Sequence, residues 1–182
     1  MNKRILFITK TALFLAILLV VQFFSKPLGQ YVTGSLVNLV LIISCCALGI
    51  YGGMILAIVS PFLAFFLGIG PAFLIIIPFI ALGNLVISLI GGTYLKRIYN
   101  QKKGTLKVGF NHLMFFVVSP LFKALVIYVG VVMIAIPLIP SLNETQVKVL
   151  SAAFSYSQLI TALIGTILSF IIYPFLRKVI KD

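Results

Sequence analysis

Lys123 is the residue whose type and position most strongly suggest chemistry, because it interrupts the longest apolar run, Asn111 to Ile139. A lysine near the middle of a bilayer costs about 2.5–3.5 kcal/mol on insertion scales, so it is a functional candidate by default. No apolar run holds an acidic residue that could pair with it, which favours an anionic group such as a substrate carboxylate. Two alternatives are that the side chain extends toward the cytoplasmic surface or that it loses its charge.

The composition around this lysine indicates an integral membrane protein. Of the 182 residues, 62% are hydrophobic and only 9% are charged, a balance that soluble domains do not have. Most of the chain lies in apolar runs near the length of about 20 residues that a membrane helix needs. The fourteen basic residues greatly outnumber the two acidic ones. They lie mostly at the ends of the runs, where they contact lipid headgroups, so we do not expect nucleic-acid binding.

The apolar runs predict an all-α bundle of six transmembrane helices that forms a single domain over residues 1–182. The connection Gly49–Gly53 carries no charge, so the helices on either side of it could instead form a re-entrant hairpin. We keep six because both runs are near spanning length. The helices are predicted at residues 5–24, 34–48, 54–67, 72–95, 111–139 and 147–176.

The basic residues predict that both termini are cytoplasmic, because lysine and arginine accumulate on the inner side of membrane proteins. With the amino terminus inside, only Lys26 and Lys148 lie on the outer side. The inner side then receives Lys3, Arg4, Lys96, Arg97, Lys102, Lys103, Lys107, Arg177, Lys178 and Lys181.

This orientation gathers polar residues in the outer half of the bundle and so predicts a pocket that opens outward. Polar and small stripes also let membrane helices pack closely, which explains most single residues equally well. The candidate substrate contacts are Asn38, Tyr128, Ser155, Tyr156 and Gln158 in the outer half, Lys123 near the midplane, and Asn84 on the polar stripe of the fourth helix.

The sequence lacks the motifs of enzymes and of energy-driven pumps. There is no phosphate-binding glycine loop followed by Lys-Ser/Thr, no cluster with metal-ligand spacing, no nucleophile motif and no pair of intramembrane carboxylates. We therefore expect no catalytic residues, no metal and no cofactor in this chain. A chain of this kind that drives uptake needs a partner that supplies energy.

Three stretches make the chain resemble the substrate-binding S components of energy-coupling-factor (ECF) vitamin transporters. They are Lys10–Ala16 with its Ala-x-x-x-Ala, Thr33–Asn38 leading to the glycine-rich Leu48–Gly53, and Ile77–Asn84 followed by a basic loop. The resemblance implies a bacterial plasma-membrane protein that binds a vitamin-like substrate with high affinity from outside. It also implies docking through Ala12 and Ala16 on an ECF module, which consists of a transmembrane scaffold and two ATPase subunits that use ATP.

Two other functions stay open at this stage. One is a stand-alone permease or channel for small solutes, and the other is a ligand-free structural subunit of a membrane complex. Within the ECF interpretation the vitamin is not identified by any motif. Lys123, if it faces the pocket, favours a carboxylate-bearing substrate, for example a small one such as pantothenate.

Overall fold

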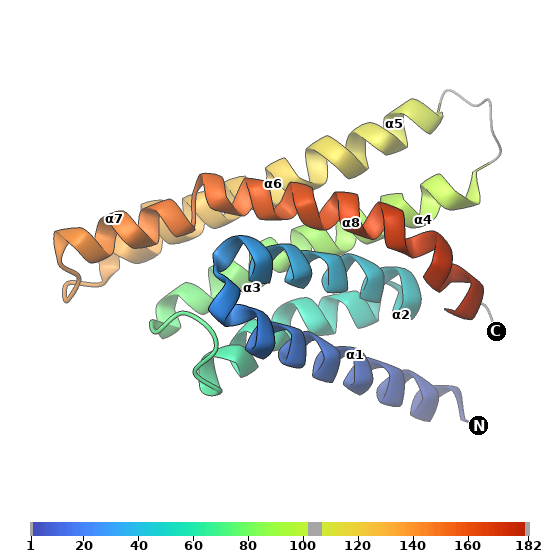
Figure 1. Ribbon diagram of the computed structural model, residues 1–182, viewed down its shortest axis with the longest axis horizontal. Coiled ribbons are helices and arrows are strands. Elements are labelled where there is room, and N and C mark those ends of the chain that lie inside the picture. Colours follow the sequence, from blue (N-terminus) through green and yellow to red (C-terminus); the bar gives the residue numbers. More distant parts are fainter. Residues whose placement is uncertain (1, 102–106, 181–182) are drawn as a thin grey trace.

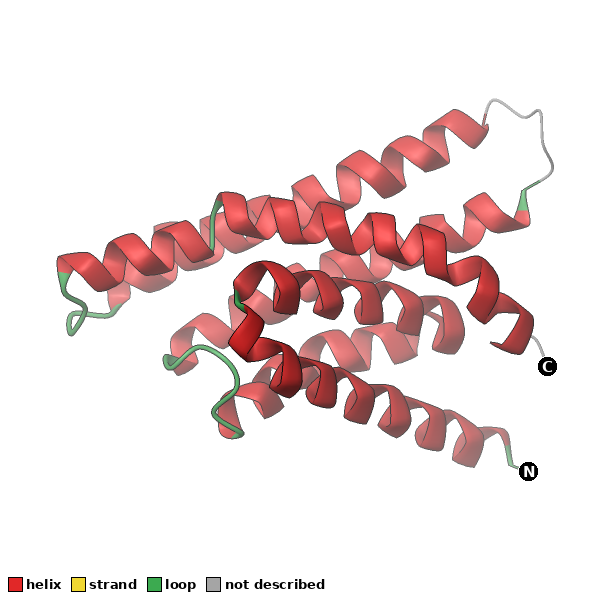
Figure 2. Cartoon of the chain, in the orientation of Figure 1, coloured by secondary structure: helices red, strands yellow, loops and turns green. Residues whose placement is uncertain are grey.

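The computed structural model describes residues 2–101 and 107–180, and within these ranges all regular structure is helical (Figure 2). In these ranges five segments are long and apolar enough to cross a membrane, where six helices were predicted. The difference arises because the helices predicted at 34–48 and 54–67 lie in one 37-residue segment. Lys102, Lys103 and Lys181, which contribute to the predicted cytoplasmic charge, lie outside the described ranges.

The first half of the chain forms three of the five long segments. Asn2 caps the first helix by accepting a hydrogen bond from the backbone N–H of Arg4 at 3.1 Å. The elements are α1 (Lys3–Ser25), a 3₁₀ turn (Lys26–Leu28), α2 (Gln30–Phe66), a second 3₁₀ turn (Leu74–Ile76), α3 (Ile77–Val86), a π-helical segment (Ile87–Gly91) and α4 (Gly92–Asn100).

The second half consists of two further long segments. A capping box starts the last one: Asn143 and Gln146 each accept a hydrogen bond from the other's backbone N–H, at 2.9 and 3.0 Å. The elements are α5 (Lys107–Leu113), a π-helical segment (Met114–Val118), α6 (Ser119–Ile127), a second π-helical segment (Tyr128–Ala135), a 3₁₀ turn (Ile136–Leu138), α7 (Glu144–Ala153) and α8 (Tyr156–Ile180).

The 37-residue helix α2 changes direction at Gly49. This residue has φ 80° and ψ −179°, a conformation that is essentially restricted to glycine. Figure 1 shows the chain doubling back at this point, so the two halves of α2 lie side by side. The break is narrower than the predicted connection Gly49–Gly53, because Gly52 and Gly53 are already helical and buried.

The other predicted boundaries shift by a few residues in both directions; the segment predicted to begin at residue 72, for example, begins at Leu74. α2 begins at Gln30 rather than at residue 34, and α4 continues to Asn100 rather than ending near residue 95. The predicted helix 147–176 is instead divided, since Phe154 and Ser155 separate α7 from α8.

The helices run between two distinct ends of the molecule (Figure 1). Both termini, the turn at Gly49, the end of α4 and the start of α5 lie at one end, which we call the terminal end. The connections between α1 and α2, between α2 and α3, and before α7 lie at the opposite end, which we call the loop end.

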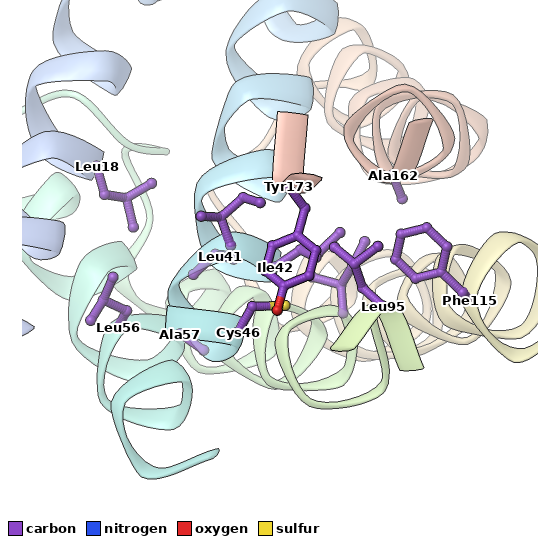
Figure 3. Packing of buried hydrophobic residues seen from close by; sticks show 12 residues of the cluster. Leu18, Leu41, Ile42, Cys46, Leu56, Ala57, Leu95, Phe115, Ala162 and Tyr173 are labelled. Atoms are coloured by element: carbon purple, nitrogen blue, oxygen red, sulfur yellow. The ribbon is translucent and has the colours of Figure 1, made fainter. Parts of the chain in front are cut away.

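Side chains from most of the long segments meet in the interior. Figure 3 shows one cluster that contains Leu18 of α1 and, from the two halves of α2, Leu41 and Leu56. Phe115 of the π-helical segment Met114–Val118 and Tyr173 of α8 complete it. A second buried cluster lies toward the loop end and comprises Ile76, Ile127, Val131, Ala135, Ile136 and Phe154. Because lipid is as apolar as these side chains, close packing and polar contacts are what hold membrane helices together.

Candidate functional site

A cavity of about 380 Å³ opens at the loop end of the bundle. Its volume lies at the small end of the range of roughly 300–1,000 Å³ that small-molecule sites occupy. Residues of α1, α2, α3, α6, α7 and α8 contribute to its wall. The lining residues are Gln22, Lys26, Gly29, Gln30, Thr33, Gly34, Val37, Pro61, Ala64, Ile69, Gly70, Pro71, Ile80, Asn84, Lys123, Leu150, Ala153, Phe154 and Gln158.

Lys123 forms the floor of this cavity and joins three helices. Its side chain is buried in α6, and its Nζ donates hydrogen bonds to Asn38 Oδ1 of α2 and, at 3.1 Å, to Asn84 Oδ1 of α3. Both asparagines are buried as well. The amino group that the apolar sequence left without a partner is therefore held by two amide oxygens, which accept its hydrogen bonds and bring no opposite charge.

Small residues allow these three helices to approach closely enough for the contacts to form. A side chain at Gly83 of α3 would overlap Ile127 of α6, and its Cβ would lie 3.6 Å from Lys123 Cγ. Gly165 of α8 has the same role behind Asn38, where an added Cβ would lie 2.5 Å from Asn38 Cβ. The small-residue stripes of the sequence thus serve both the packing and the position of the polar groups.

Some polar groups around the floor lack a partner. Asn38 Nδ2 and Thr33 Oγ1 are buried, and neither has a hydrogen-bond partner among the residues that the structure describes. Ser119 Oγ, one helical turn before Lys123, is in the same state. Buried polar atoms without a partner are rare and costly in folded proteins. Of the three residues only Thr33 lines the cavity, so its hydroxyl group is the one that a polar ligand or a water molecule in the cavity can satisfy.

The rim of the cavity is formed by long polar side chains. Gln30 Nε2 and Gln158 Nε2 both donate to the carbonyl oxygen of Ala153, at 3.2 and 3.0 Å. Lys26 Nζ donates to the carbonyl oxygen of Gly68 at 2.7 Å and so fastens the loop after α2. The rim is therefore fixed in place by contacts between elements distant in sequence.

The structure brings together four of the seven predicted substrate contacts. Asn84, Lys123 and Gln158 line the cavity, and Asn38 holds Lys123 from behind. Tyr128 and Tyr156 are exposed on the outside of the bundle. Ser155 is not part of the lining, and its Oγ donates to the carbonyl oxygen of Ala152 at 3.3 Å. A ligand role for these last three residues is a prediction that the cavity does not support.

The sequence argument did not select several polar lining residues as substrate contacts. Gln22, Gln30 and Thr33 come from the end of α1 and the start of α2, where the apolar runs end. Polar residues are common at such ends because they face the headgroup region, so residue type alone did not identify these three as substrate contacts. The sequence does place Gln22 and Gln30 at the outer rim of the bundle, and the structure shows that Gln22 is buried there.

The predicted docking residues lie away from the cavity. Ala12 and Ala16 are exposed on α1, which is the least buried of the five long segments. Large apolar residues such as Leu13, Ile17 and Val20 are exposed beside them. This face of α1 has no neighbour among the described residues, so it meets lipid or another protein.

The fold and the cavity define a multi-pass membrane protein with a small chamber at one end, which has a mainly apolar wall and a few polar side chains. A scan of protein families gives a more specific result, since the model of the ECF transporter substrate-specific component matches residues 6–177. The chain belongs to this family, whose members are subunits of transporters rather than enzymes. No curated protein and no solved structure matches it.

Proposed function

We propose that the chain is the high-affinity substrate-binding subunit of an ATP-driven importer for a vitamin or related micronutrient. The observation that carries the proposal is the cavity at the loop end, with Lys123 and Asn84 in its wall, in a chain of the S-component family. The cavity receives the substrate from outside the cell. A separate module with a membrane scaffold and two ATPase subunits supplies the energy, so the chain itself needs no cofactor.

Binding is tested on the purified protein with a panel of water-soluble vitamins. We expect one of them to raise the melting temperature and to bind at one-to-one stoichiometry in isothermal titration calorimetry. Native mass spectrometry of the purified protein should show a retained small molecule. If no vitamin shifts the melting temperature and no small molecule is retained, the proposal is wrong.

The orientation belongs to the same proposal: six crossings in the bacterial plasma membrane, with both termini in the cytoplasm. It is supported by the inner position that it gives to Lys3, Lys96 and Arg97. Single cysteines introduced at Tyr51 and Ser141 into a cysteine-free chain test it, because both residues are exposed. A membrane-impermeant maleimide should label the cysteine at 141 in intact cells and the one at 51 only after the cells are opened. The reverse pattern would contradict the orientation, and labelling of both in intact cells would contradict the six crossings.

Docking on the energising module is assigned to the exposed face of α1 at Ala12 and Ala16. Small residues at this spacing form a flat surface that a partner helix can approach. The double substitution A12F/A16F should abolish uptake in cells that contain the module while ligand affinity stays unchanged. The control is Leu125→Trp on α6, an exposed position on a different helix, which should leave uptake intact. Equal effects of the two changes would remove α1 as the docking face.

A further inference from the structure

We propose that the ligand is a small carboxylate with hydroxyl or N–H groups at its other end, and that it binds with its carboxylate on Lys123. This inference rests on the proposed function, because it names the class of substrate for the same cavity. It follows from the different hydrogen-bonding character of the floor and the rim.

At the floor, Lys123 offers a hydrogen-bond donor. A protonated lysine has three N–H groups, and Lys123 directs two of them to Asn38 and Asn84. The third is left for the cavity that Lys123 lines. A donor in this position calls for an acceptor from the ligand.

Charge selects an anionic acceptor over a neutral one. The lining contains two lysines, Lys26 and Lys123, and no acidic residue. Glu144 lies at the start of α7 outside the lining, and the other acid of the chain, Asp182, lies beyond the described residues. A carboxylate on Lys123 would form a charge-assisted hydrogen bond, which is roughly twice as strong as a neutral one, in surroundings where electrostatic interactions are strengthened.

The rim offers acceptors. The amide nitrogens of Gln30 and Gln158 are both directed to the Ala153 carbonyl oxygen. Because an amide has its donors on nitrogen and its acceptor on oxygen, this arrangement leaves the two Oε1 atoms to accept from a ligand. A molecule that places a carboxylate at the floor therefore satisfies the rim with hydroxyl or N–H groups.

Asn38 is a positioning residue in this arrangement, since it does not line the cavity but holds Lys123 Nζ. The substitution Asn38→Asp uses this contact. It keeps an oxygen on Lys123 but adds a fixed negative charge that neutralises the ammonium from behind. The anion should then lose its electrostatic attraction while the shape of the cavity is preserved.

The experiment compares acids with neutral partners of the same shape: nicotinate with nicotinamide, pantothenate with panthenol, and biotin with biotinamide. Affinities are measured by titration calorimetry on the purified wild-type chain. We expect at least one acid to bind, and its neutral partner to bind about tenfold more weakly or worse, as the loss of a charge-assisted hydrogen bond implies.

Two variants then test whether the preference for the acid arises at Lys123. Asn38→Asp should weaken the acid by about tenfold or more while the affinity of the neutral partner changes less than about threefold. Lys148→Met removes an exposed outer-side positive charge outside the lining and should change neither affinity. Circular dichroism and size-exclusion chromatography confirm that both variants are folded.

Different results would contradict the carboxylate inference and the proposed binding function. A neutral partner that binds as tightly as its acid overturns the carboxylate inference but leaves the binding subunit in place, and this comparison needs no variant. The same holds if Asn38→Asp leaves acid affinity unchanged. Absence of binding by every probe, with no small molecule retained in native mass spectrometry, counts against the proposed function itself.

Discussion

Replacing Gly165 with alanine tests whether the close approach of α8 to α2 positions the buried polar cluster. An added Cβ would lie 2.5 Å from Asn38 Cβ, 2.9 Å from the carbonyl oxygen of Ser35 and 3.2 Å from the backbone nitrogen of Leu39. None of these atoms is the end of a flexible side chain, so none can rotate away. The helices must separate instead. Overpacking typically costs about 1–3 kcal/mol, and the rigid neighbours place this change toward the upper part, about 2–3 kcal/mol.

The assay is equilibrium unfolding in mixed micelles with increasing dodecyl sulfate, followed by circular dichroism. Gly109→Ala is the matched control, because Gly109 is also helical and an added Cβ there meets no atom within 4 Å. Its free energy of unfolding should stay the same or rise by up to about 1 kcal/mol, since alanine favours the helix over glycine. Gly165→Ala should also weaken ligand binding, since it displaces Asn38 and with it Lys123. If the two glycine variants unfold with the same free energy, the close contact between α8 and α2 is refuted.

Two further substitutions test the terminal end of the bundle in the same unfolding assay. Gly49→Ala forces a non-glycine residue into the conformation at the break of α2, which should cost about 1–3 kcal/mol; no loss would mean that the turn has another backbone geometry. Arg177→Met removes the guanidinium that donates to the Tyr99 carbonyl oxygen at 2.6 Å and to Asn100 Oδ1 at 2.7 Å, and should cost about 1 kcal/mol. The neighbouring exposed Lys178→Met should cost close to nothing, and equal losses in the two variants would contradict a specific link between α8 and α4.

The sequence was sufficient to locate the spanning segments and the inward face of the helix that carries Lys123. Apolar runs of this length have few alternative structures. Helical spacing places Ser119 and Gly130 on the same face as Lys123, and both are buried. The convergence of Asn38 and Asn84 on Lys123 could not be derived, because one sequence does not show which helices are neighbours.

The predicted depth of a residue in the membrane was a poor guide to substrate contact when the side of the helix on which the residue lies was not considered. Tyr128 follows Lys123 by five residues, which is about 140° around an α-helix, and the structure accordingly exposes it. Tyr156 and Gln158 are two residues apart and so lie nearly opposite each other. Gln158 lines the cavity and Tyr156 is exposed. Combining depth with face would have removed both tyrosines from the list of substrate contacts.

The π-helical segments on either side of α6 have a consequence for how this helix can vary in length. In a regular α-helix, deleting one residue rotates everything that follows by about 100°, which would turn Lys123 away from Asn38 and Asn84. Met114–Val118 and Tyr128–Ala135 have wider turns with i→i+5 hydrogen bonds. A deletion there can be absorbed by a return to α-helical turns. In an alignment of relatives, single-residue gaps should therefore gather in these two segments and avoid Ser119–Ile127.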